Sequence, residues 1–271
     1  MPPAGQFIIS LVHEPTHRER WAAIIDEFKQ HSFTVKTFLF IAGVIGVSQL
    51  LLLVAPVAGV FANVVALALL AAFAIRSDRT RTMAIAASIL PLATMVSLAL
   101  PQSNALDQSA VLYSVLFVLA FAYHYIFPYD KSAGKLTWKG YLAIAPTMIV
   151  AGQVLGALSY GVLRNEQSFG GISLPVVTIA MILFALTEEI FFRGLIQEQA
   201  SKAINPIVAP VLTATLYTLM TLPIGSIATT LFAASSSIIL SCIYYTKPNI
   251  VITTIANMTL KVFFVGLLAA F

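Results

Sequence analysis

The sequence predicts an all-α protein, a polytopic transmembrane helical bundle of about nine spans whose N terminus lies in the cytoplasm. Hydrophobic residues make up 59% of its 271 residues and charged residues only 10%, whereas about a quarter of a soluble domain is charged. The mean hydropathy is +0.92. Apolar stretches of about 20 residues, the length that crosses a bilayer as a helix, recur along the chain. We therefore expect an integral, multi-pass protein of the cell membrane.

The first 35 residues are too polar for a cleaved secretory signal, whose apolar core would lie near the start. Within them Trp21, Ile24, Ile25 and Phe28 recur at helical spacing, with charged residues between them. This pattern predicts a short amphipathic helix on the cytoplasmic surface of the membrane. A solvated tail that folds only against the loops explains the pattern nearly as well.

The predicted spans follow this segment in chain order. We place them at 37–55, 58–75, 83–100, 109–128, 140–163, 173–193, 206–222, 226–245 and 250–270. In the fifth span Gly152, Gly156 and Gly161 bring small residues to one side of the helix, which permits close packing of another helix. The single cysteine, Cys242, is expected to pack within the bundle, and the serine run 235–237 is expected to hydrogen-bond between helices.

The basic residues orient these spans, because Lys and Arg accumulate in cytoplasmic loops. Nine spans with the N terminus inside place thirteen of the fifteen basic residues on the cytoplasmic side: Arg18, Arg20, Lys29, Lys36, Arg76, Arg79, Arg81, Lys131, Lys135, Lys139, Arg193, Lys202 and Lys247. Arg164 falls on the other side, and Lys261 lies within the last span. The net charge of +4 is thus an orientation signal. We expect membrane lipids as partners and no nucleic acid.

Two adjacent carboxylates, Glu188 and Glu189, close an apolar helix that begins near Leu174. A charge at bilayer depth costs on the order of 3 kcal/mol, so intramembrane acids usually face a polar cavity and serve a function. Arg193 follows Glu189 by four residues and is spaced to pair with it. Glu188 is then the freer acid, suited to act as a general base that activates water. Spacing alone leaves a second interpretation open, an ion-paired helix end that reaches toward the cytoplasm.

The stretch Glu-Glu-Ile-Phe-Phe-Arg-Gly at 188–194 resembles the Glu-Glu-x-x-x-Arg signature of the CPBP intramembrane protease family. This family contains CAAX prenyl endopeptidases and bacteriocin-processing or immunity proteins, and the resemblance covers roughly residues 171–265. It divides the chain into a cytoplasmic segment (1–35), N-terminal transmembrane helices (36–170) and a CPBP-like core (171–271). The resemblance implies that a glutamate of the first motif activates water for peptide hydrolysis. A second motif, aromatic-x-x-x-His, would supply a base or metal ligand, and a third, His-x-x-x-Asn, further polar groups.

The second and third motifs depart from the family pattern. Tyr217 matches the aromatic position of the second motif, and Thr221 replaces its histidine. In the third motif Asn257 replaces the histidine and Lys261 replaces the asparagine. The histidines of the chain all precede the carboxylates: His13, His17, His31 and His124. The family's usual histidines are therefore absent.

These replacements bear on cofactor and mechanism. Threonine is not among the usual zinc ligands, so we expect no metal and no other cofactor, although zinc is possible in the family. Asn257 can donate a hydrogen bond to a developing oxyanion. Lys261 lies about 16 Å along the last helix. We hypothesise that it pairs with Glu188 and makes the network neutral and structural; in an active enzyme it would instead stabilise the oxyanion.

Three functional hypotheses follow from the sequence. In the first, the chain is a CPBP-family endopeptidase in which Glu188 or Glu189, supported by Arg193 and Asn257, activates water against a membrane-associated peptide or lipidated protein. In the second, it has lost catalysis and is a scaffold, or pseudoprotease, that binds a membrane partner. A third hypothesis, a transporter, has the least support, because no pair of broken, repeated helices is evident.

Two placements stay open at this level. The predicted helix 206–222 would put Thr221 near the outer surface, whereas Glu188 would lie nearer the cytoplasm. That helix therefore begins deeper than drawn, or the second motif is misaligned. His124 is the one histidine placed to approach the acids, although a hydrogen-bonded packing histidine is the commoner case.

Overall fold

The computed structural model describes residues 17–100, 105–127, 137–164 and 172–271. All regular structure in these residues is helical, and eight helices are long and apolar enough to cross a membrane. The predicted class, an all-α polytopic helical bundle, is therefore confirmed. The chain forms two compact units, Met1–Leu39 and Phe40–Phe271.

The first unit contains the beginning of helix α2 (His17–Val54). The apolar part of this helix, long enough to span a membrane, begins at Phe33. The side chains of Trp21, Ile24, Ile25 and Phe28 lie outside the described part of the chain. The interfacial location of this segment therefore stays a prediction.

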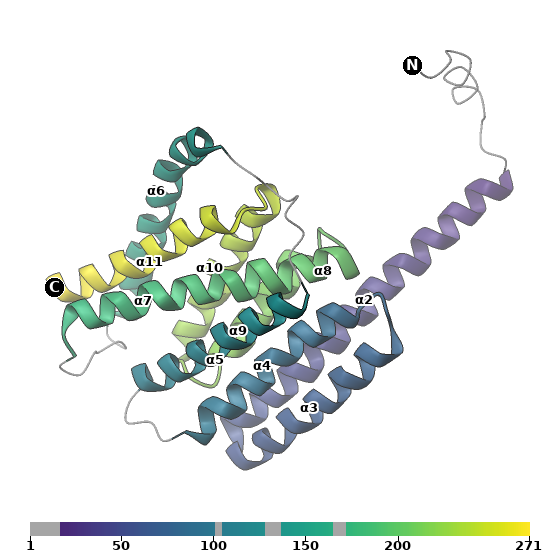
Figure 1. Ribbon diagram of the computed structural model, residues 1–271, viewed down its shortest axis with the longest axis horizontal. Coiled ribbons are helices and arrows are strands. Elements are labelled where there is room, and N and C mark those ends of the chain that lie inside the picture. Colours follow the sequence, from purple (N-terminus) through teal and green to yellow (C-terminus); the bar gives the residue numbers. More distant parts are fainter. Residues whose placement is uncertain (1–16, 101–104, 128–136, 165–171) are drawn as a thin grey trace. The chain divides into compact units, whose positions relative to one another are not determined.

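The second unit contains the remaining helices (Figure 1). They are α3 (Pro56–Arg76), α4 (Arg81–Ala99), α5 (Ala105–Ile126), α6 (Trp138–Leu163), α7 (Leu174–Glu188), η1 (Glu189–Gln197), α8 (Glu198–Ala203), α9 (Ala209–Thr221), α10 (Ile227–Thr246) and α11 (Ile250–Ala270). Several helices start as their sequences dictate: the side chains of Thr137, Ser226 and Asn249 accept hydrogen bonds from backbone N–H groups at the starts of α6, α10 and α11.

The predicted spans 173–193 and 206–222 differ from the observed helices. The first continues through η1 and α8, so that Leu174–Ala203 forms one apolar stretch of 30 residues. The second corresponds to α9, which has only 13 residues and is not among the helices long enough to cross a membrane. Prolines explain the short helix, because Pro206 and Pro223 bracket it and a proline has no backbone N–H to continue the helical hydrogen bonds.

The close packing predicted for the fifth span is confirmed at Gly152 and Gly156, where α6 meets α11, but not at Gly161, where nothing lies within 4 Å. A Cβ atom on Gly152 would lie 2.4 Å from the carbonyl oxygen of Ala256, and one on Gly156 would lie 2.7 Å from that of Leu260. Only glycine allows this approach of the two backbones. The prediction for Cys242 is wrong, because its side chain is exposed on the surface of α10; a small, weakly polar thiol is tolerated there.

Candidate functional site

The two carboxylates lie at a change of helix type. Glu188 is the last residue of α7, and Glu189 is the first residue of η1, a π-helix of nine residues. π-Helical segments are rare and occur frequently at functional sites. Both side chains are buried, with 1% and 0% of their surface exposed. Groups buried to this degree need partners for every charge they carry.

Glu188 accepts hydrogen bonds from four residues on three other helices. Its Oε1 accepts from the hydroxyl of Tyr217 at 3.0 Å, from the ammonium of Lys261 at 3.0 Å and from the hydroxyl of Tyr113. Its Oε2 accepts from the Asn257 amide at 3.0 Å. α5, α9 and α11 therefore converge on this one carboxylate.

Glu189 is held by a second set of contacts. Its Oε1 accepts from the Asn257 amide at 2.8 Å and lies 3.3 Å from Nη1 of Arg193. Nη2 of Arg193 in turn donates to the backbone oxygen and the hydroxyl of Ser237, both at 3.1 Å. The interhelical hydrogen bonding predicted for the serine run is therefore confirmed at Ser237 alone, since the hydroxyls of the other two serines donate to backbone oxygens within α10. The other oxygen, Oε2, has no hydrogen-bond partner among the described residues. Asn257 thus bridges the two carboxylates.

The charges of this cluster balance. Two carboxylates meet two cations, Arg193 with 1% of its side chain exposed and Lys261 with 16%. Removing charges from water costs several kcal/mol for each ion, which pairing and further hydrogen bonds offset. The contact of Lys261 with Glu188 is the one expected from the sequence. With two negative and two positive groups, the cluster is formally neutral.

The structure brings together most residues that the sequence singled out. Glu188, Glu189, Arg193, Tyr217, Asn257 and Lys261 form the connected cluster. The hydroxyl of Thr221 instead donates to the backbone oxygen of Thr218 at 2.9 Å. His124 lies in the last turn of α5, about 16 Å along the helix axis from Tyr113.

Sequence reasoning missed Tyr113. It stands in an apolar stretch of α5, and its hydroxyl reaches the carboxylate of Glu188 across 75 positions of sequence. The one signal available was its residue type, because a buried tyrosine hydroxyl usually finds a hydrogen-bond partner. The short α9 also resolves the placement of the second motif, since Tyr217 contacts Glu188 directly.

A cavity of about 230 Å³ lies beside the cluster. The site residues that line it are Tyr113, Tyr217, Asn257 and Lys261. The carboxylates themselves are not among the described residues that line it. Hydroxyl-bearing residues complete much of the polar lining: Ser109, Ser159, Thr221, Thr229 and Ser236. The cavity therefore meets the hydrogen-bond donors of the cluster.

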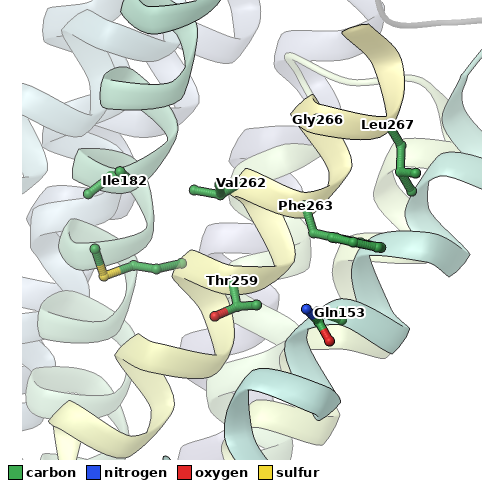
Figure 2. Close-up of a pocket in the computed structure, with 8 residues that line it drawn as sticks. Gln153, Ile182, Thr259, Val262, Phe263, Gly266 and Leu267 are labelled. Atoms are coloured by element: carbon green, nitrogen blue, oxygen red, sulfur yellow. The ribbon is translucent and has the colours of Figure 1, made fainter. Parts of the chain in front are cut away.

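A larger and more apolar cavity of about 560 Å³ lies between α6, α7 and α11 (Figure 2). Ile182 of α7, Val262 and Phe263 of α11 and Gln153 of α6 line it. None of these residues belongs to the carboxylate cluster. It is a separate feature of the surface formed by these helices.

The fold and the site together define a polytopic membrane protein with a buried glutamate pair at its centre. Residues 170–263 match the family model described as type II CAAX prenyl endopeptidase Rce1-like. The match confirms, for this segment, the CPBP resemblance that the Glu-Glu-x-x-x-Arg motif predicted. It supports the assignment of this segment to a CAAX-protease-like family of membrane endopeptidases. No curated protein and no solved structure gave a match.

Proposed function

We propose that this chain is a non-catalytic, CAAX-protease-like protein of the cell membrane that binds a membrane-associated peptide or protein without cutting it. The observation that carries the proposal is the direct contact between Lys261 and Glu188, at 3.0 Å. The ammonium lies against the carboxylate that would otherwise act as the base. In this arrangement the glutamate pair has a structural role.

The hydrogen bonds of Glu188 support the same conclusion. A general base must lie within hydrogen-bond reach, about 2.6–3.2 Å, of the water it activates. A carboxylate offers about four acceptor sites on its two oxygens. Tyr113, Tyr217 and Lys261 all donate to Oε1, and Asn257 donates to Oε2. These contacts compete with water for the carboxylate.

The donor set does not fit zinc. A catalytic zinc ion takes three protein ligands, usually from His, Cys, Asp or Glu. Thr221 stands where the family's second motif has histidine, and its hydroxyl is directed to the backbone oxygen of Thr218. A cation, the ammonium of Lys261, already contacts Glu188. The described part of the chain has no group of three His, Cys, Asp or Glu side chains arranged to hold a metal ion.

A second candidate, an endopeptidase that uses Glu189, rests on a different observation. Oε2 of Glu189 is buried and has no hydrogen-bond partner among the described residues, so this oxygen keeps its acceptor sites for a water molecule that enters during the reaction. Both N–H groups of the Asn257 amide already donate to the carboxylates, whereas the ammonium of Lys261, which lines the adjoining cavity, has further N–H groups that can donate to an oxyanion. In this alternative Glu189 is the base, and Lys261 stabilises the developing negative charge.

A comparison of membrane-protein termini tests the two candidates. Cells that produce the wild type, Glu188→Gln or Glu189→Gln would be compared for new protein N termini by mass spectrometry of their membranes. Glu198→Gln is the matched control, because Glu198 lies on the same helical stretch but pairs with Lys202, at 2.6 Å. We expect no termini that depend on either acid. Termini lost in Glu189→Gln but kept in Glu198→Gln would instead support the endopeptidase.

The binding part of the proposal has its own test. Partners would be captured by photo-crosslinking in intact membranes, with a crosslinking residue substituted at Ser109, a residue that lines the cavity. We expect one crosslinked membrane partner, retained in Glu189→Gln. Crosslinks to lipid alone would contradict partner binding at the cavity.

A further inference from the structure

The cavity beside the carboxylate cluster extends toward one end of the second unit. Its deep part is lined by Tyr113 and Lys261. Three of its other lining residues lie where helices begin or end: Leu106 in the first turn of α5, Leu163 at the end of α6 and Gly225 in the turn between α9 and α10. The cavity therefore opens toward one end of the second unit, and helix ends form its mouth.

These helix ends belong to the same end of the unit. Leu163, Val177, Phe264 and Val265 form one buried apolar cluster, which joins the end of α6, the start of α7 and the end of α11. Phe232, from the second turn of α10, packs against this cluster. The starts of α7 and α10 and the ends of α6 and α11 thus meet around the cavity mouth.

The basic residues gather at the opposite end. There the turn between α3 and α4 meets the end of α8, because Arg79 donates to the backbone oxygen of Ala203 at 3.0 Å. The start of α6 meets the turn before α11, because the Asn249 amide donates to the Tyr141 hydroxyl at 2.9 Å. The described basic residues of this end are Arg76, Arg79, Arg81, Lys139, Lys202 and Lys247, whereas Arg164 lies at the mouth end. By the positive-inside rule, the basic end faces the cytoplasm.

The path from the carboxylates along η1 to the basic end is closed. Phe191 and Phe192 are completely buried, and Ile196 and Gln197 are each 1% exposed. Gln197 also donates to the backbone oxygen of Ser241 on α10 at 2.8 Å, which ties the two helices together below the site. Water and solutes therefore reach the cluster more readily from the cavity mouth than along this helix.

We infer that the site opens to the non-cytoplasmic side of the membrane. At about 30 Å³ for each water molecule, a cavity of about 230 Å³ admits roughly seven waters or one or two side chains, not a folded domain. Its ligand is then an extended segment or chain end of a membrane-bound peptide presented from the outer side. The identity of this ligand rests on the proposed function, but the direction of opening does not.

Cysteine labelling along α10 tests the direction of opening. The protein has one cysteine, so Cys242→Ala gives a background without thiols. Four single variants would be made on it: Thr229→Cys and Ser236→Cys, which line the cavity, Ser241→Cys, which is fully buried, and Thr246→Cys, which is exposed at the basic end. Each would be treated with a membrane-impermeant, positively charged methanethiosulfonate, applied separately to the two sides of oriented membranes.

We expect Thr229→Cys and Ser236→Cys to react only from the outer side, Thr246→Cys only from the cytoplasmic side, and Ser241→Cys from neither. Ser109→Cys repeats the cavity measurement on a second helix, α5. Reaction of Ser236→Cys and Ser109→Cys from the cytoplasmic side would overturn the inference. So would a failure of both to react in folded protein when both react after denaturation. No activity is needed for this measurement, so its failure is distinct from failure of the proposed function.

Discussion

The ammonium of Lys261 lies 3.0 Å from Oε1 of Glu188, although the two residues are 73 positions apart in the sequence. The contact joins the middle of α11 to the end of α7. It supplies the positive charge that balances Glu188, while Arg193 balances Glu189. The pair therefore links helix packing and charge balance in a single interaction.

Replacing Lys261 with methionine should destabilise the protein. Glu188, which is 1% exposed, would keep its charge and lose its cation, and breaking a buried pair from one side costs about 3–5 kcal/mol. Because Lys261 retains 16% of its side-chain exposure, we expect the lower part of that range. Unfolding in mixed detergent micelles, followed by circular dichroism, measures the change.

The double variant Glu188→Gln with Lys261→Met is the control for that experiment. It removes both charges together, so most of the lost stability should return. If Lys261→Met alone is as stable as the wild type, the contact has no structural role and the proposed function loses its main support.

Asn257→Leu should also lower the free energy of unfolding, because hydrogen bonds rather than an ion pair are lost. The Asn257 amide donates to Oε2 of Glu188 and to Oε1 of Glu189. Hydrogen bonds to charged groups contribute about 1.5–3 kcal/mol each, so the free energy of unfolding should fall by about 3 kcal/mol. Val251→Leu, at a half-exposed position of the same helix and outside the cluster, should change it by less than about 0.5 kcal/mol. Equal stability of the two variants would contradict the bridging role.

Substitutions of Tyr113 and Tyr217 should have energetically coupled effects on stability. Both hydroxyls donate to the same oxygen of Glu188. Each change to phenylalanine should cost about 1–3 kcal/mol, because a donor to a buried carboxylate is lost. A double-mutant cycle should give an interaction energy of at least about 0.5 kcal/mol. Strict additivity, with costs no larger than that of Tyr245→Phe at an exposed position, would refute the shared contact.

Gly152→Ala and Gly161→Ala should have opposite effects, although both lie on α6. A Cβ atom at Gly152 would lie 2.4 Å from the backbone oxygen of Ala256, whereas at Gly161 nothing lies within 4 Å. Overpacking at the first site should cost about 1–3 kcal/mol. The second change should be neutral or stabilise by up to about 1 kcal/mol, because alanine favours the helix. Thermal unfolding in detergent distinguishes them, and similar melting temperatures would argue against the close contact of α6 and α11.

The sequence by itself determined the fold class and the first motif. An apolar composition and recurring spans of about 20 residues leave a helical bundle as the economical solution, since helices satisfy their own backbone hydrogen bonds in lipid. The glycine spacing on α6 determined one helix contact, because only glycine permits backbones so close. The Glu-Glu-x-x-x-Arg pattern located the carboxylates, and the depth of Lys261 indicated that it needed a counter-charge.

Only the tertiary structure decided what surrounds those charges. Tyr113 carries no local signal that connects it to Glu188, since the contact depends on how α5 packs against α7. The length of α9 followed from the prolines at its two ends, which lack the backbone N–H a helix needs and which a scan for apolar residues passes over. The position of the cavity depends on which helix ends meet. These features arise from contacts between residues far apart in the chain, and hydrophobic patterning along one helix does not encode them.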